Sequence, residues 1–262
     1  MKQSLTKIEG NKLNMDEEKT ISEEKEQRSF LSLVVGIFTE PTKTFPILAE
    51  KKLWILFPIC FIFLSTFFST YIFYERVDRE AFIMEQFRKS KFASQMPQEQ
   101  MEKAVDDFKN KSSFMQSILV PFFIYVWLIL ATVVYYFSFL TLGGLNRFMQ
   151  TLQVVFWAEL TTFLAQLISI PVMLLKAPDQ LLNPQEILLT NLGAIIGSQN
   201  LSPVSFSLLS SLDIFIIWNL VLLTLGLAAV SKLSKGFSAL IIFSLFAVKI
   251  ILKTVWIAFF IQ

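Results

Sequence analysis

Apolar residues dominate the chain after residue 50, and they form five stretches that are each long enough to cross a bilayer. The stretches cover residues 53–74, 118–142, 152–175, 207–229 and 239–261. A helix of about 20 apolar residues spans the ~30 Å hydrocarbon core of a membrane. Backbone groups in lipid must be paired within the segment, so spans of this length are helices. The pattern predicts an all-α, polytopic membrane protein with five transmembrane helices.

Polar segments divide the chain before the first span. Residues 1–28 are rich in Lys and Glu and lack aromatic residues, which predicts a disordered cytoplasmic tail. Residues 29–52 follow a short helical pattern that Pro41 interrupts, which predicts interfacial and juxtamembrane helices too short to span. Residues 53–262 then form a five-span membrane domain.

The connection over residues 75–117 has two apolar stripes at helical spacing. The first, which continues the first span outward, consists of Val77, Ala81, Met84 and Phe87. The second, which follows Pro97, consists of Met101, Ala104, Val105 and Phe108. Stripes at this spacing are typical of amphipathic helices. They predict a helical hairpin that stands on the membrane, packed through the two stripes.

A second connection, over residues 176–206, also contains helical signals. Asn183 followed by Pro184 is a good helix start, with a capping side chain and a proline in the first turn. Residues 187–196 are apolar but too few to span. This segment predicts an interfacial or partly re-entrant helix.

Composition agrees with a membrane protein and excludes several kinds of chemistry. Hydrophobic residues make up 54% and charged residues 17%, against about 25% charged in a soluble domain. The 23 basic and 21 acidic residues nearly balance, so we expect no nucleic-acid partner. Histidine is absent and Cys60 is the only cysteine, which excludes His-dependent triads and removes the usual zinc and haem ligands. We expect no metal, no cofactor and no enzymatic activity.

Basic residues indicate the orientation. Nine of them precede residue 53, and Arg147, Lys232 and Lys235 fall on the same side, which makes twelve. The opposite side has nine, which are eight in residues 75–117 and Lys176. The excess of positive charge faces the cytoplasm in most membrane proteins. The protein is therefore expected in the cell membrane, with its N-terminus cytoplasmic and its C-terminus extracytoplasmic.

Ionisable residues at membrane depth are the candidate functional residues. The candidate polar cluster consists of Glu159, Gln166, Lys249, Lys253 and Asp213. Charges in the bilayer core cost about 2.5–3.5 kcal/mol each and usually face the bundle interior. We expect Glu159 to face Lys249, and Lys253 to reach toward Asp213, which also caps the fourth span. The cluster is either an ion or proton path or a set of packing contacts between helices.

Several short motifs occur in an order and spacing that resembles a known family. They are Glu40-Pro41-Thr42-Lys43-Thr44-Phe45, Leu142-Gly143-Gly144, Leu182-Asn183-Pro184 with Asn191, Leu212-Asp213-Ile214-Phe215-Ile216-Ile217-Trp218, Gly226-Leu227-Ala228-Ala229 and Ser234-Lys235-Gly236. The chain resembles the bacterial branch of the YIP family, the Ypt/Rab-interacting-protein type of five-span membrane protein. The resemblance implies a cytoplasmic N-terminus and a short outer C-terminus, and it carries over no catalytic residue. Eukaryotic members bind Rab GTPases, and bacterial relatives are linked to membrane-embedded transporter complexes.

Two functions fit these observations. The first is a non-enzymatic integral membrane scaffold or accessory subunit of a membrane complex, associated with an ABC-type transporter. Its partners would be the lipid bilayer and either another membrane protein or a second copy of the chain. The alternative is a small permease that uses intramembrane Glu159 and Lys249. Five spans without an evident inverted repeat favour the first function.

Overall fold

A computed structural model describes residues 29–91 and 96–261, so the predicted tail over residues 1–28 lies outside the described residues. Within the described ranges the regular elements are helices, and there is no β-strand. Five helical stretches are long and apolar enough to span a membrane, namely Lys52–Arg76, Ser113–Thr141, Phe148–Leu175, Ile214–Ser231 and Lys235–Phe260. The predicted all-α, five-span class is confirmed.

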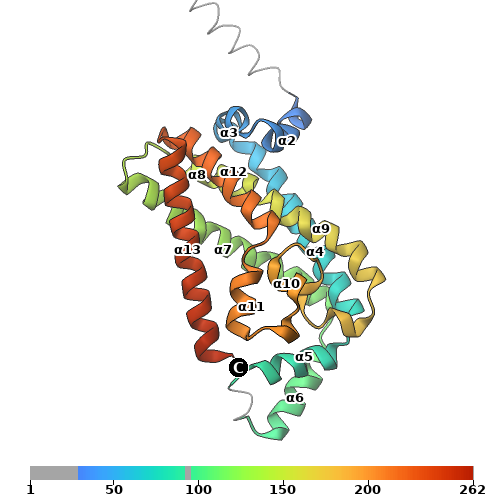
Figure 1. The fold of residues 1–262 in the computed structure, drawn as a ribbon. Helices are drawn as coiled ribbons and strands as arrows, with labels where there is room; N and C mark the ends of the chain where they lie inside the picture. Colours follow the sequence, from blue (N-terminus) through green and yellow to red (C-terminus); the bar gives the residue numbers. More distant parts are fainter. Residues whose placement is uncertain (1–28, 92–95, 262) are drawn as a thin grey trace, which may run out of the picture.

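The molecule has two distinct ends, which lie at the top and bottom of Figure 1. The end called here the α3 end contains α2 (Phe30–Thr39) and α3 (Pro41–Glu50). The opposite end, called the α6 end, contains α5 (Arg79–Lys89) and α6 (Gln98–Lys109).

The helices before the first span are packed into the bundle. Pro41 is the first residue of α3, as expected of a residue that cannot continue a helix but can start one. Phe45 and Leu48 of α3 are fully buried in the core cluster that also contains Trp157 and Leu227 of the spans. These helices therefore help to fix the α3 end of the bundle.

The spans pack around α12 (Ile214–Ser231), which is the most buried of the five. It contacts α3, α8 (Phe148–Ala158), α9 (Leu160–Leu175) and α13 (Lys235–Phe260). On the other side, α4 (Leu56–Arg76), which follows the 3-10 turn η1 (Lys52–Ile55), packs against α7 (Ser113–Thr141) and α9. The least buried span is α13, drawn in red on the left side of Figure 1.

Two predicted span boundaries need correction. The fourth span begins at Ile214 and not at residue 207, because Asp213 caps α12 and the separate helix α11 (Pro203–Ser210) precedes it. The third span is two helices, since α8 ends and α9 begins at Glu159. Pro171, the interruption visible in the sequence, lies inside α9 without ending it.

The hairpin predicted for residues 75–117 is present, with different contacts. Its helices α5 and α6 meet through the stacked rings of Phe82 and Phe108, whose centroids are 5.9 Å apart. Phe82 performs the packing predicted for Met84, whose side chain is 46% exposed. The prediction that α5 continues the first span is wrong, because α4 ends before Val77 and Asp78 caps a new helix.

The connection from 176 to 213 consists of short turns. It contains η3 (Pro178–Leu181), η4 (Pro184–Glu186), α10 (Leu192–Ile196), η5 (Ser198–Asn200) and α11. Asn183 does cap a turn, as predicted, but the turn is only η4. The predicted helix over 187–196 is wrong in its first half, because α10 begins only after Asn191, which caps it.

Candidate functional site: a polar cavity in the bundle

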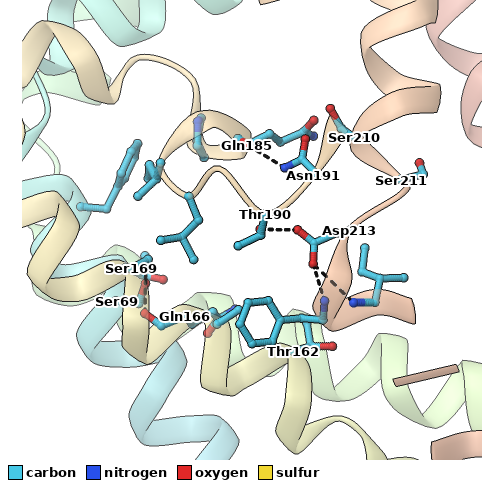
Figure 2. A pocket seen from close by; sticks show the side chains of 18 of the residues that line it. Ser69, Thr162, Gln166, Ser169, Gln185, Thr190, Asn191, Ser210, Ser211 and Asp213 are labelled. Carbon is cyan, nitrogen blue, oxygen red and sulfur yellow. Dashed lines mark hydrogen bonds between the residues drawn. The ribbon is translucent and has the colours of Figure 1, made fainter. Parts of the chain in front are cut away.

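A cavity of about 650 Å³ lies among the spans toward the α6 end. Its walls come from α4, α9, the segment before α10, the end of α11, the start of α12 and one face of α13. Figure 2 shows the hydroxyl and amide side chains that line it. The charged residues of the lining are Asp213, Lys249 and Lys253. A cavity in a membrane bundle that has charged, hydroxyl and amide side chains in its lining is a candidate binding site.

One wall is the contact between α4 and α9. Thr66 donates a hydrogen bond to the Gln166 side-chain oxygen over 3.1 Å, and the hydroxyls of Ser69 and Ser169 lie 3.3 Å apart. Ser169 also donates to the Gln166 carbonyl. Polar side chains between helices in lipid are stabilised by such mutual hydrogen bonds. Gln166, predicted from the sequence alone, thus contributes to helix packing as well as to the cavity.

Asp213 forms the corner where the connection meets α12. Its carboxylate accepts hydrogen bonds from the backbone N–H groups of Phe215 (2.8 Å) and Ile216 (3.4 Å) and from the Thr190 hydroxyl. The Ile214 N–H donates to the Thr190 carbonyl over 3.2 Å. The predicted capping role of Asp213 is present, and its carboxylate is occupied by these donors.

Asn191 holds the neighbouring part of the wall. Its side-chain nitrogen donates to the Gln185 carbonyl over 3.1 Å, and its side-chain oxygen accepts from the Ala194 N–H over 2.7 Å. The residue is buried. Sequence reasoning named Asn191 only as part of a motif and did not place it beside Asp213. A capping residue directly before a short apolar run was the available signal.

Two lysines enter the cavity from α13. Lys249 and Lys253 are four residues apart and share a helix face, and both line the cavity. The Lys249 ammonium lies 5.9 Å from the ring centroid of Trp127 on α7. Among the described residues neither lysine forms an ion pair with a carboxylate. The cavity therefore contains two cations without a bound counter-charge from the protein.

Glu159 lies apart from this cavity. It stands at the junction of α8 and α9, beside Thr162 and Asn219, and it is not part of the lining. The charge of Lys249 acts on it, but the two do not form an ion pair. Four of the five residues of the predicted cluster thus surround one cavity, and Glu159 lies behind its wall.

A second cavity of about 780 Å³ adjoins the first on the side of α5. Phe82, Pro184, Gln185 and Lys253 line both. In the second cavity the Glu85 carboxylate contacts Arg88 at 2.6 Å and Lys89 at 3.3 Å. Burial raises the pKa of Glu85, but hydrogen bonds and charges from these two cations outweigh it, so its pKa lies below the ordinary value. Sequence reasoning missed this group, although an acid followed by bases three and four residues later was a visible signal.

The motif residues that carry the family resemblance gather at the two ends of the bundle. At the α3 end, a Cβ on Gly226 would lie 3.0 Å from the Phe45 ring, so the two motifs are in direct contact. There too, the Leu145 N–H, next to Leu142-Gly143-Gly144, donates to the Ser231 carbonyl over 3.0 Å. At the α6 end, the motifs supply Asn183, Asn191 and Asp213, the caps described above.

Fold and site define a five-span α-helical membrane protein with a cavity among its spans, lined in part by polar side chains. The chain matches the Yip1 domain over residues 35–257, and it belongs to this family. The family membership expected from the motifs is confirmed. No curated protein and no solved structure matches the chain.

Proposed function

We propose that the protein is a non-enzymatic membrane scaffold or accessory subunit of a membrane complex, of the kind associated with an ABC-type transporter. The proposal is supported by the role of the motif residues, which pack against each other or cap helices. Phe45 and Gly226 pack against each other, and Asp213 and Asn191 cap helices. Residues engaged in packing and capping build a rigid frame, which suits a subunit that presents a fixed surface to a partner.

The surface proposed to meet the partner is the outer face of α13. This span is the least covered by the chain itself. Val248, Ile251, Leu252, Val255 and Trp256 are each about half exposed or more. In a bilayer, helix faces of this kind are covered by lipid or by the helices of another subunit. A membrane-protein partner or a second copy of the chain would be held here.

The proposed orientation places the α3 end in the cytoplasm and the C-terminus outside the cell membrane. Twelve basic residues on the side of α3 against nine on the side of α6 support it. The partner would then meet α13 from within the membrane, and α6 would face the exterior.

Affinity purification of the full chain in mild detergent tests the accessory role. We expect a complex larger than the 30.1 kDa monomer that contains a second membrane protein. Val248→Trp and Ile251→Trp, on the exposed face of α13, should weaken recovery of the partner, whereas Val134→Trp on the exposed face of α7 should not. A clean monomer under several gentle conditions would contradict the proposal.

A second candidate, a small permease, is favoured by one observation, the polar cavity with Lys249 and Lys253 at membrane depth. Reconstituted vesicles should then show flux of small organic anions that Glu159→Gln or Lys249→Met reduces several-fold, while Glu99→Gln on exposed α6 leaves it unchanged. Flux that is indifferent to both changes removes the reason for proposing a permease.

A further inference from the structure

The two adjoining cavities, together called the recess, lie at the α6 end of the membrane domain. They share Lys253, Gln185, Pro184 and Phe82 along their boundary. Lys253 precedes the last residue of α13, Phe260, by seven positions, which is about 10 Å along the helix at ~1.5 Å per residue. Lys249 lies about 16 Å from the same point. Both ammonium groups are therefore within reach of a molecule that enters from the nearer membrane surface.

The charge of the recess is positive. Its lining contains Arg88, Lys89, Lys249 and Lys253 against two carboxylates, Glu85 and Asp213. Glu85 contacts Arg88 and Lys89, and Asp213 is occupied by the α12 N–H groups and Thr190. Lys249 and Lys253 are close enough to repel each other. An uncompensated charge at membrane depth is costly, so an anion in the recess would be stabilised by both lysines.

Two buried hydroxyl groups in the lining have no hydrogen-bond partner. Ser207, 3% exposed, lines the second cavity, and Ser210, 8% exposed, lines the first. Figure 2 shows Ser210 at the end of α11, across from Asn191. Buried polar groups in proteins are normally satisfied. Each is therefore an unsatisfied donor at the edge of the recess.

Part of the lining is apolar. Phe73, Met173, Phe246 and Ile250 contribute hydrocarbon surface to the first cavity. Lys249 lies over Trp127, whose own side chain is 56% exposed on the outer surface of α7. The wall between α13 and α7 is therefore where the recess meets the bilayer, so an apolar chain could leave through it.

We propose that this recess binds an anionic phospholipid, with its phosphate held by Lys253 and Lys249 and its acyl chains passing between α13 and α7. A phosphate accepts charge-assisted hydrogen bonds from ammonium groups, which matches the two lysines. The apolar lining and the opening to lipid favour a lipid over a free anion. The proposal goes beyond the accessory role and does not depend on it.

Binding is measured on the purified full chain in a neutral detergent. We expect phosphatidylglycerol to raise the thermal midpoint and to remain bound in native mass spectra, while phosphatidylcholine and inorganic phosphate do neither. Lys253→Met and Lys249→Met should each weaken binding about tenfold, the value of one charge-assisted hydrogen bond. Lys253→Arg should retain it. Lys235→Met, at the opposite end of the same helix, is the matched control and should bind as the unchanged protein does.

Other outcomes overturn the proposal. If phosphatidylcholine binds as well as phosphatidylglycerol, the lysines do not select the lipid. If inorganic phosphate raises the thermal midpoint as much as phosphatidylglycerol does, the site binds a free anion. Unchanged affinity in both methionine variants moves the lipid elsewhere on the surface.

Photo-crosslinking avoids variants that fail to fold. A phosphatidylglycerol analogue with a diazirine near its phosphate, used on the unchanged protein in vesicles, should label α13 around Lys249–Lys253 and the segment around Gln185. Label confined to the exposed face of α7 would refute the recess as its site. Either result is independent of whether a partner protein is recovered.

Discussion

At the residue scale, Gly226 allows three elements to meet at the α3 end. A Cβ at this position would lie 2.6 Å from Val154 of α8 and 3.0 Å from the ring of Phe45 of α3. No side chain other than hydrogen fits without movement of its neighbours. Small residues at helix interfaces in membranes allow this close approach.

Gly226→Val should therefore destabilise the bundle. Overpacking of a filled core costs about 1–3 kcal/mol, and α3 should separate from α12. The thermal midpoint in detergent measures the effect. Gly236→Ala is the control, because a Cβ there meets nothing within 4 Å. Equal midpoints for Gly226→Val and the control would show that α3 is not packed on α12 as described.

Asp213 is the residue whose role was most fully predictable. A carboxylate directly before an apolar run is a helix N-cap signal that depends only on neighbouring residues. The partners of Lys249 and Lys253 were not predictable, because they depend on how α7, α11 and α13 are placed around each other. Helix caps that depend on neighbouring residues could therefore be predicted from the sequence, whereas contacts between distant elements could not.

Replacement of Asp213 tests the cap. Asp213→Ala removes the acceptor of Phe215, Ile216 and Thr190 and should cost about 1–2 kcal/mol. Asp213→Asn keeps a side-chain oxygen and should cost less. Thermal midpoints measure both, with Asp179→Ala in exposed η3 as control. An unchanged thermal midpoint in Asp213→Ala would mean that the N–H groups at the start of α12 do not depend on this carboxylate.

At the element scale, the spans were predicted well and their ends were not. Hydropathy marks the apolar run from α11 into α12 as one span, since both helices are apolar, and only Asp213 reveals the break. In the third span, Glu159 interrupts the helix, whereas Pro171 does not. A window average does not register one polar residue inside an apolar run.

The ion pairs of Glu85 on α5 should make the stability of the protein depend on pH. The pKa of Glu85 in the folded protein is lowered by Arg88 and Lys89, so its contribution to stability is present above the unfolded value of about 4.3 and is lost as pH falls through the folded value. Between about pH 6 and pH 3.5, the thermal midpoint should fall further for the unchanged protein than for Glu85→Gln. Glu99→Gln on α6 should behave as the unchanged protein does. Parallel losses in all three would mean that the pair around Glu85 does not stabilise the fold.

At the scale of the whole molecule, the two ends of the bundle are built differently. The α3 end is filled by a core of Trp157, Phe45, Leu33 and their neighbours. The α6 end contains the two polar cavities and the short helical turns between α9 and α12. Span count and family were predictable from the sequence, but the recess was not, because it forms where many segments that are distant in the sequence converge.

In a five-span topology, the crossing by α4 places α3 and α6 on opposite sides of one membrane, and the proposed orientation depends on it. Cysteine accessibility in intact cells tests it directly, after Cys60 is replaced by Ser. With one new cysteine each, Asn110→Cys at the end of α6 should react with a membrane-impermeant maleimide from outside, whereas Thr42→Cys and Gly236→Cys should react only after lysis. Reaction of Asn110→Cys and Thr42→Cys from the same side would contradict a single crossing by α4, and with it the five-span bundle.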